Sequence, residues 1–322
     1  MFVADTHCDS ISFEVKGISG LVSAYNASRD QHLQIYAMFC EFPWQMPEIY
    51  KEIGRKDGCE IASGGDLLDY YIDKYYESLK KYKTLLHTNC YEEIKKAFAE
   101  GKNAGLISVE GCNSIDTLEK LHKYYEKGVR FVGLTWNQNN VIGCGALASR
   151  TDKDTGLTDY GKEFVKECHR LGIVVDVSHS SDKTIDDVLS VSDRPVIASH
   201  SNFREVCDCN RNLEKCHSDE IVRRGGFIGL NLCDGFVTLN KDVPYVTGML
   251  LPHVQYALDN GYGDNIGFGF DIDGIDKYPS DISMDESIHD KYVELLIENY
   301  GKEITEKIAG KNFLGFYRQY EK

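Results

Sequence analysis

The chain has 322 residues, which is enough for one large domain or two ordinary domains with a substantial buried core. Its 51 acidic residues outnumber its 36 basic residues, so the formal net charge is -15, and no cluster of Lys and Arg stands out. Nucleic-acid binding is therefore disfavoured, because phosphate recognition needs a concentrated basic face. The composition suits a protein that acts on small molecules.

Two further features predict a cytoplasmic protein with no membrane partner. The first residues lack the basic and apolar regions of a secretory signal, and no apolar run approaches the roughly 18 residues of a membrane span. Eleven cysteines, an odd number, argue against a disulfide framework. Cys207, Cys209 and the pair Cys216-His217 could hold a structural zinc, but their spacing departs from paired CxxC motifs, so dispersed reduced thiols are favoured.

Eight short apolar segments are predicted as strands. The first begins at Val3 and runs into His7-Cys8-Asp9, and the others cover residues 32–42, 104–109, 129–135, 173–178, 195–199, 226–231 and 265–270. Most of them are apolar on both faces, which is typical of a parallel sheet that is buried on both sides.

Amphipathic helices are predicted between most of these strands, because apolar residues recur there at helical spacing. They cover residues 66–82, 91–100, 114–127, 159–171, 182–191, 214–224 and 247–260, and two more at 285–299 and 303–317 close the chain. Ser114 is placed to cap the third of these helices. Residues 43–65 show no clear period and are predicted to form a long loop.

This alternation predicts one α/β domain over residues 1–322, a (β/α)8 TIM-type barrel with extra C-terminal helices and a long loop after the second strand. The alternative is a doubly wound sheet. That fold needs a glycine-rich phosphate loop after its first strand, and here the first strand leads into His7-Cys8-Asp9 instead.

Potential metal ligands follow four of the predicted strands. They are His7, Asp9, Glu110, His179 and His200. In a barrel the carboxyl ends of the strands meet at one rim, so these side chains are expected to converge. Imidazole with carboxylate suits zinc, and five ligands exceed the needs of one tetrahedral ion, which predicts two ions that share Glu110. Taken singly, each histidine is better explained as a hydrogen-bonded core or rim residue, and it is their joint position on one rim that favours metal binding.

Two more residues on this rim are candidates for catalysis and substrate binding. Asp271 ends the eighth predicted strand and is expected to accept a proton beside the metals, whereas Asp273 points away and fixes the turn. Arg211 follows the strand of His200, and its planar guanidinium suits a substrate carboxylate. A surface salt bridge is the alternative for Arg211.

These motifs resemble those of the membrane (renal-type) dipeptidase family of the metal-dependent amidohydrolase superfamily. They are Asp5-x-His7-x-Asp9, Val109-Glu110-Gly111, Asp176-x-Ser178-His179, Ser199-His200-Ser201, Arg211-Asn212 and Asp271-x-Asp273-Gly274. The resemblance implies two zinc ions, one held by His7, Asp9 and Glu110 and the other by Glu110, His179 and His200. It also implies that Arg211 binds the C-terminal carboxylate of a dipeptide and that Asp271 assists a bridging hydroxide.

Trp136 departs from the family pattern, which has Leu-Thr-His where this chain has Leu134-Thr135-Trp136. An indole N–H donates one hydrogen bond but carries neither a proton nor a charge. Loss of an oxyanion donor typically costs about 2.7 to 4 kcal/mol of barrier, and Asn137, Asn139 or Asn140 could compensate from the same loop. Asn113 is a second departure, at a position where many relatives have histidine.

The predicted function is a binuclear zinc dipeptidase, in which a metal-bridging hydroxide attacks the amide and Asp271 passes a proton to the leaving amine. One alternative keeps the metals and uses Trp136 to bind an acyl chain or a ring, as in a deacylase, lactonase or phosphoesterase. A catalytically silent binder is the other alternative, and retention of the five ligands argues against it. The sequence leaves the oligomeric state open, and a homodimer is one possibility.

Overall fold

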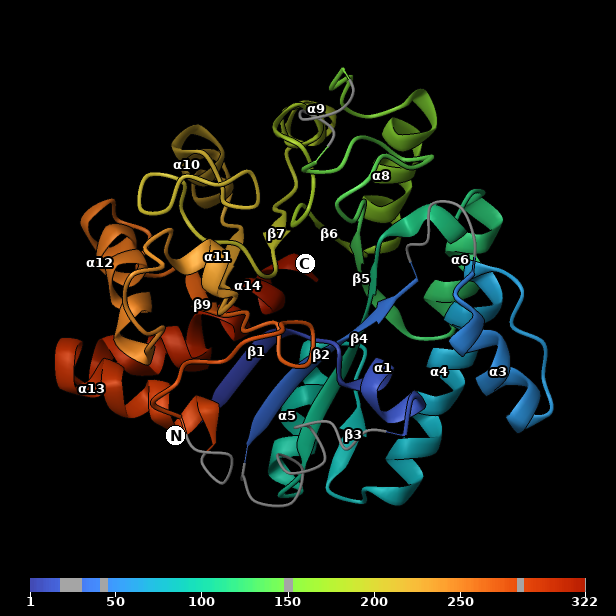
Figure 1. Ribbon diagram of the computed structural model, residues 1–322, viewed down its shortest axis with the longest axis horizontal. Helices are drawn as coiled ribbons and strands as arrows, with labels where there is room; N and C mark the ends of the chain where they lie inside the picture. Colours follow the sequence, from blue (N-terminus) through green and yellow to red (C-terminus); the bar gives the residue numbers. More distant parts are fainter. Residues whose placement is uncertain (18–30, 41–45, 148–152, 283–286, 322) are drawn as a thin grey trace.

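Eight parallel strands close into a barrel in the computed structural model, which describes residues 1–17, 31–40, 46–147, 153–282 and 287–321 (Figure 1). In ring order they are β1 (Val3–Cys8), β2 (His32–Phe39), β4 (Asn103–Glu110), β5 (Val129–Gly133), β6 (Val174–Asp176), β7 (Ile197–Ala198), β8 (Phe227–Leu230) and β9 (Ile266–Phe268). Pairing of β2 with β4 and of β1 with β9 closes the ring. The predicted (β/α)8 barrel is therefore confirmed.

Each of the eight predicted strands overlaps one strand of the ring. A further strand, β3 (Leu85–His87), pairs with β4 outside the ring. The sequence analysis missed β3, because Leu85 alone of its three residues is buried and leaves no apolar pattern. Residues 41–42 of the second predicted strand lie outside the described residues.

Helices surround the barrel (Figure 1). Those that match predicted helices are α4 (Gly64–Lys81), α5 (Tyr91–Ala99), α6 (Leu118–Glu126), α8 (Asp159–Leu171), α9 (Asp182–Val191), α10 (Lys215–Arg223), and α12 (Leu251–Asp259) with the preceding turn η2 (Thr247–Leu250). The C-terminal helices are α13 (Ile288–Glu306), the π-helical turn η3 (Lys307–Lys311) and α14 (Asn312–Tyr320). Three short elements directly follow β1, β4 and β8: α1 (Ser10–Val15), η1 (Cys112–Ser114) and α11 (Asp234–Val237).

Two local predictions are wrong. Helix α3 (Glu48–Asp57) occupies part of the segment that was predicted as a loop, and its buried residues are Tyr50 and Gly54. A buried helix face of two residues, one of them glycine, leaves little helical periodicity in the sequence. Ser114 does not cap α6, because it belongs to η1; Thr117 caps the helix instead by accepting a hydrogen bond from the backbone N–H of Lys120 at 3.3 Å.

Aromatic residues of α14 pack against the first half of the barrel strands. The rings of Phe313 and Phe227 lie 5.4 Å apart, and those of Tyr317 and Phe131 stack at 5.5 Å. These rings belong to one buried apolar cluster with Ala4 and other early strand residues. The amino-terminal end of the barrel is thus filled with apolar side chains, which leaves polar chemistry to the carboxyl ends of the strands.

No helix in the described part of the chain combines the length and the apolar character of a membrane span.

Gly269 provides a test of how closely the barrel strands approach one another. A Cβ atom at Gly269 would lie 1.9 Å from the carbonyl oxygen of Ser199 and 2.9 Å from the backbone of Gly229, so Gly269→Ala forces backbone segments apart. We expect this variant to lose about 1 to 3 kcal/mol of unfolding free energy in urea, measured with chelator present so that metal binding does not contribute.

Gly315→Ala is the matched control. Gly315 lies on the exposed face of α14 with no atom within 4 Å of a built Cβ, so alanine there should add roughly 0.5 to 1 kcal/mol of stability. Equal stabilities of the two variants would contradict the packing described here.

Candidate metal centre

Glu110, the last residue of β4, lies between two groups of ligands. Its Oε2 is 3.3 Å from His7 Nε2, whereas its Oε1 is 3.0 Å from His179 Nε2 and 3.8 Å from His200 Nε2. The two oxygens of one carboxylate therefore face different histidines. This is the arrangement that a carboxylate shared by two cations requires.

Asp9 and Asp271 complete the side of the centre that contains His7. Asp9 Oδ2 lies 3.4 Å and Asp271 Oδ1 3.8 Å from His7 Nε2. A Cβ at Gly274 would lie 2.2 Å from Asp271 Oδ1 and 2.3 Å from Asp9 Oδ2, so glycine is required where the backbone passes over these carboxylates.

The three imidazoles are close to one another, although they come from different strands. The ring centroids of His7 and His200 are 3.7 Å apart, and those of His179 and His200 are 4.8 Å apart. The Nε2 atoms of His7 and His200 are buried and have no hydrogen-bond partner among the described residues. Buried lone pairs and carboxylates that converge in this way fit divalent cations such as zinc.

Neighbouring polar groups set the tautomer of two of these imidazoles. The Ser199 hydroxyl donates to the Asp176 carboxylate, which can only accept, so His200 Nδ1–H donates to Ser199 Oγ at 2.7 Å. His179 Nδ1–H donates to Asn137 Oδ1 at 2.9 Å. In both rings Nε2 is left with its lone pair toward Glu110, as metal ligation requires.

The charges in the centre are strongly coupled. Burial, and then the Glu110 carboxylate, raise the pKa of Asp9 to about 7. Burial also raises the pKa of Asp271. Burial opposes the charged form of His7, but Glu110 and Asp9 outweigh it and raise its pKa, whereas burial and Arg211 lower the pKa of His179 to about 3. The centre thus holds protons that divalent cations would displace.

His179 and Asp271 also have unusual backbone conformations, with φ of 65° and 60°. Residues other than glycine rarely adopt this left-handed region, and strain of this kind is concentrated at functional sites. Both residues lie just beyond barrel strands, His179 after β6 and Asp271 after β9, where the chain turns at the rim.

A hollow of about 300 Å³ opens beside the centre. Its wall includes Asp9, Glu110, His179 and Asp271, and the aromatic residues Phe13, Phe39, Trp136 and Phe236. The ring of Trp136 meets Phe39 edge to face at 5.2 Å and lies 5.9 Å from His179. The lining of the hollow therefore combines acidic and aromatic side chains.

Arg211 is buried behind this hollow, with 7% of its surface exposed. Its guanidinium lies 5.1 Å from the ring of Phe236, and Nη2 donates to the carbonyl oxygen of His200 at 3.4 Å. Nε has no hydrogen-bond partner among the described residues. The surface salt bridge that was the alternative for Arg211 does not fit this burial.

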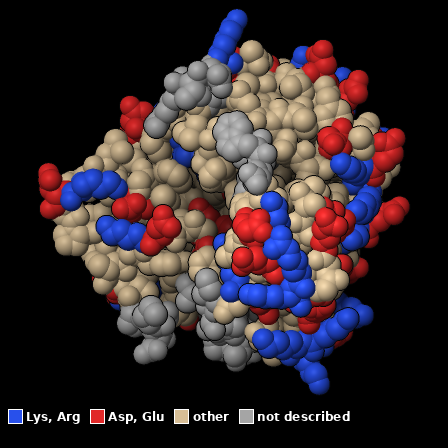
Figure 2. Space-filling model, turned by 45° about the vertical axis from the view of Figure 1, so that its right-hand side comes forward, with Lys and Arg blue, Asp and Glu red and all other residues tan. Residues whose placement is uncertain are grey.

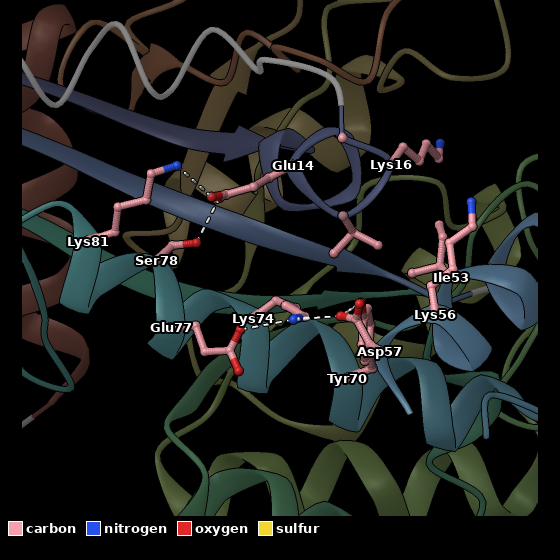
Figure 3. Close-up of a pocket in the computed structure, with 12 residues that line it drawn as sticks. Glu14, Lys16, Ile53, Lys56, Asp57, Tyr70, Lys74, Glu77, Ser78 and Lys81 are labelled. Atoms are coloured by element: carbon pink, nitrogen blue, oxygen red, sulfur yellow. Dashed lines mark hydrogen bonds and ion pairs between the residues drawn. The ribbon is translucent and has the colours of Figure 1, made fainter. Parts of the chain in front are cut away.

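A larger hollow of about 500 Å³ lies between α1, α3 and α4 (Figure 3). Its acidic groups are engaged by neighbours: Lys74 pairs with Asp57 at 2.8 Å and with Glu77 at 3.0 Å, and Ser78 donates to Glu14 at 2.8 Å. The residues that line it include no histidine or cysteine. Size alone therefore does not identify the metal site.

Outside the centre at Glu110, the cluster of Glu214, Cys216 and His217 also has the residue types of a metal site. Its groups are already engaged, because Arg204 pairs with Glu214 at 2.6 Å and His217 Nε2 donates to Asp186 at 3.0 Å. Cys207, which the sequence grouped with Cys216, instead points its thiol at the Gly235 carbonyl oxygen. All eleven thiols are free, as the sequence predicts.

On the face shown in Figure 2, Lys and Arg side chains lie among Asp and Glu side chains.

Sequence reasoning missed the groups that support the centre. Asn231 Nδ2 donates to Asp271 Oδ2 at 3.0 Å, and Asn231 directly follows an apolar run, the signal used for the other site residues. Of the three asparagines considered as substitutes for the family histidine, Asn137 lines the hollow. Asn139 and Asn140 instead hold their own loop by accepting hydrogen bonds from its backbone N–H groups.

Comparison with known proteins finds a family model, described as membrane dipeptidase (peptidase family M19), that matches residues 64–322. His7 and Asp9 precede the matched residues. A Schizosaccharomyces pombe protein named uncharacterized dipeptidase C965.12 is 30% identical over 261 residues, which cover 80% of this chain and 61% of that protein. The chain thus spans less than two thirds of the length of this relative.

Two solved structures share the fold. Dipeptidase AC, a metallopeptidase of family M19, gives a TM-score of 0.81 at 21% identity and covers 99% of this chain and 98% of its own. A metallopeptidase from Rhodobacter sphaeroides, liganded with a phosphinate mimic of the dipeptide L-Ala-D-Ala, gives a TM-score of 0.78 at 20% identity over 99% of each chain.

Glu110→Gln tests whether this residue is shared between two ions. A neutral amide bridges two cations poorly, so the variant should retain at most one zinc per chain after dialysis, against about two for the parent protein, by elemental analysis. Zinc at about 100 times its Kd should stabilise the protein by about 2.7 kcal/mol for each ion bound, so a variant that holds one ion should gain roughly half as much as the parent.

Glu163→Gln, at an exposed position on α8, is the control and should bind zinc as the parent does. Two tightly bound ions in Glu110→Gln would contradict the shared-carboxylate geometry.

Proposed function

Because the chain belongs to the membrane dipeptidase family, peptidase family M19, we propose that it is a metal-dependent dipeptidase that hydrolyses the amide bond of small dipeptides. The observation that carries the proposal is the division of the Glu110 oxygens between His7 on one side and His179 and His200 on the other. The hollow of about 300 Å³ beside this carboxylate has the size of a small ligand.

The proposed cofactor is a pair of zinc ions. His7, Asp9 and Glu110 would hold one ion, and Glu110, His179 and His200 the other. When bound, such a pair supplies a hydroxide at neutral pH and polarises the substrate carbonyl. The fit rests on the buried, unpartnered Nε2 atoms of His7 and His200 and on the fixed tautomers of His179 and His200.

Asp271 is the proposed proton carrier. Asn231 donates to its Oδ2, so Oδ1, which faces His7, remains able to take a proton from the attacking water. Burial raises the pKa of Asp271, which makes the carboxyl a better base for this step and lets it return the proton to the leaving amine.

Arg211 is the proposed partner of the substrate's C-terminal carboxylate. A buried guanidinium with an unpartnered N–H is costly unless an anion joins it. Its guanidinium lies 5.1 Å from the ring of Phe236, which lines the hollow, so the positive charge would be close to a substrate bound there. The carboxylate of a dipeptide would supply the missing charge and a planar pair of acceptors.

Trp136 is the proposed side-chain selector. With Phe39 it forms an aromatic wall that suits a bulky apolar side chain on the residue before the cleaved bond. The same wall favours the second candidate function, hydrolysis of another small amide or ester with an acyl chain or ring. Dipeptides and N-acyl amino acids in one substrate panel distinguish the two, and the panel includes L-D dipeptides because the similar Rhodobacter structure binds an L-Ala-D-Ala mimic.

The cytoplasm is the proposed location. All eleven thiols are free, several of them buried, as in proteins of a reducing compartment.

Arg211→Met should reduce kcat/KM for dipeptides by about 30-fold or more, chiefly through KM, because it removes one partner of a buried charge pair. For the same dipeptides with an amidated C-terminus, kcat/KM should change by less than about fivefold, because their terminus is uncharged. Steady-state kinetics on both substrate sets, with zinc supplied, provide the comparison. An equal loss on both sets would refute the role of Arg211, and absence of turnover of every dipeptide would refute the proposed activity.

Trp136→His tests the departure from the family pattern. A restored oxyanion donor should raise kcat for Ala-Ala and similar small dipeptides by about 10²-fold, because such donors are typically worth that much. Trp136→Phe keeps an aromatic wall without a donor and is the control, for which we expect kcat close to that of the parent. A lower kcat in Trp136→His than in Trp136→Phe would show that histidine supplies no oxyanion donor at this position.

A further inference from the structure

The first and last strands of the barrel meet at a sparsely paired seam. Strands β1 and β9 are paired at one position, Asp5 with Phe268, and Cys8 at the end of β1 is paired with Ile272 beyond β9, whereas β2 and β4 are paired continuously from Leu33 to Phe39. His7 lies in β1 on one side of this seam, and Asp271 follows β9 on the other. His7 Nε2 is 3.8 Å from Asp271 Oδ1. Backbone pairing across the seam is therefore interrupted between these two positions, where His7 and Phe270 lie.

The buried carboxylate of Asp5 adds a second restraint. Its Oδ1 accepts the backbone N–H of His7 at 3.2 Å and the backbone N–H of Phe270 at 3.1 Å. Phe270 immediately precedes Asp271. One oxygen atom thus joins the backbone of the proposed ligand His7 to the backbone that carries the proposed proton carrier.

His289, in the first turn of α13, holds this carboxylate in place. Its Nε2–H donates to Asp5 Oδ2 at 2.7 Å, and both residues have 0% of their surface exposed. The imidazole also stacks on Phe270 at 5.1 Å. A carboxylate without access to water needs such donors, because a buried acceptor that loses one is strongly destabilised.

We propose that His289 is a positioning residue of the metal centre, which fixes the separation of His7 and Asp271 through Asp5. The inference rests on the proposed function for the two zinc ions. The other half of the centre is supported separately, since Asp176 and Ser199 orient His200. Loss of His289 should therefore lower the zinc affinity of the position at His7 and leave the zinc affinity of the position at His200 nearly unchanged.

The experiment titrates chelator-treated protein with zinc against a competing chromogenic chelator, which gives a Kd for each of the two positions without any dipeptide. In His289→Leu we expect one Kd to rise about 10- to 100-fold and the other to change less than about threefold, as for loss of a group that supports a ligand. His289→Gln, whose amide N–H can still reach Asp5, should recover most of the lost affinity.

His217→Leu is the matched control, because His217 is a buried imidazole that donates to a carboxylate, Asp186, on the outer helices. It should lower the melting temperature of the metal-free protein and leave both zinc affinities unchanged. If His289→Leu does not fold, His289→Asn, which is too short to reach Asp5, replaces it.

Unchanged affinities in the His289 variant, or an equal loss at both positions, would overturn the inference and leave the proposed function standing. Failure of the parent protein to bind zinc would instead refute the proposed function, and the inference with it.

Discussion

Three buried carboxylates that face one another within a few ångströms set the main constraint on this structure. Asp9, Glu110 and Asp271 all lie close to His7, with 7% to 9% of their surfaces exposed. Burial disfavours their charged forms and like charges in so little water repel, so burial and then Glu110 raise the pKa of Asp9 to about 7. Bound protons offset this repulsion in part. Divalent cations would offset it more fully, because one cation can contact several carboxylates and imidazoles at once.

The fold meets this constraint by building rigid support behind each ligand. Asp176, at the end of β6, accepts backbone N–H groups of Ser178 and Ser199 at 3.0 Å and thereby ties the ends of β6 and β7 together. Asp5 does the same between β1 and the chain that follows β9. The carboxylates of Asp176 and Asp5 thus accept backbone N–H groups from neighbouring strand ends. These bonds help to fix the positions of the candidate ligands that follow.

The sequence was sufficient to predict what depends on regular geometry. His7, Glu110, His179 and His200 each follow an apolar run, and a parallel barrel brings the ends of such runs to one rim. What it could not predict depends on contacts between distant segments. The bond between Asp5 and His289 joins residues 284 positions apart, and no local sequence pattern marks His289.

The side chain of Trp136 and the hydrogen bonds that support the candidate ligands are separate parts of the structure. The loop after β5 is held by its own side chains: Asn140 Nδ2 donates to the Leu134 carbonyl oxygen at 2.9 Å, and Asn137 orients His179. Trp136 itself contributes none of these hydrogen bonds and contacts Phe39 and His179 through its ring. Replacement of this one side chain therefore alters the wall of the hollow and its hydrogen-bond donors, while the supports of the ligands stay in place. In the proposed enzyme, cation binding and the choice of substrate would therefore be separable properties, because different residues with different neighbours would determine them.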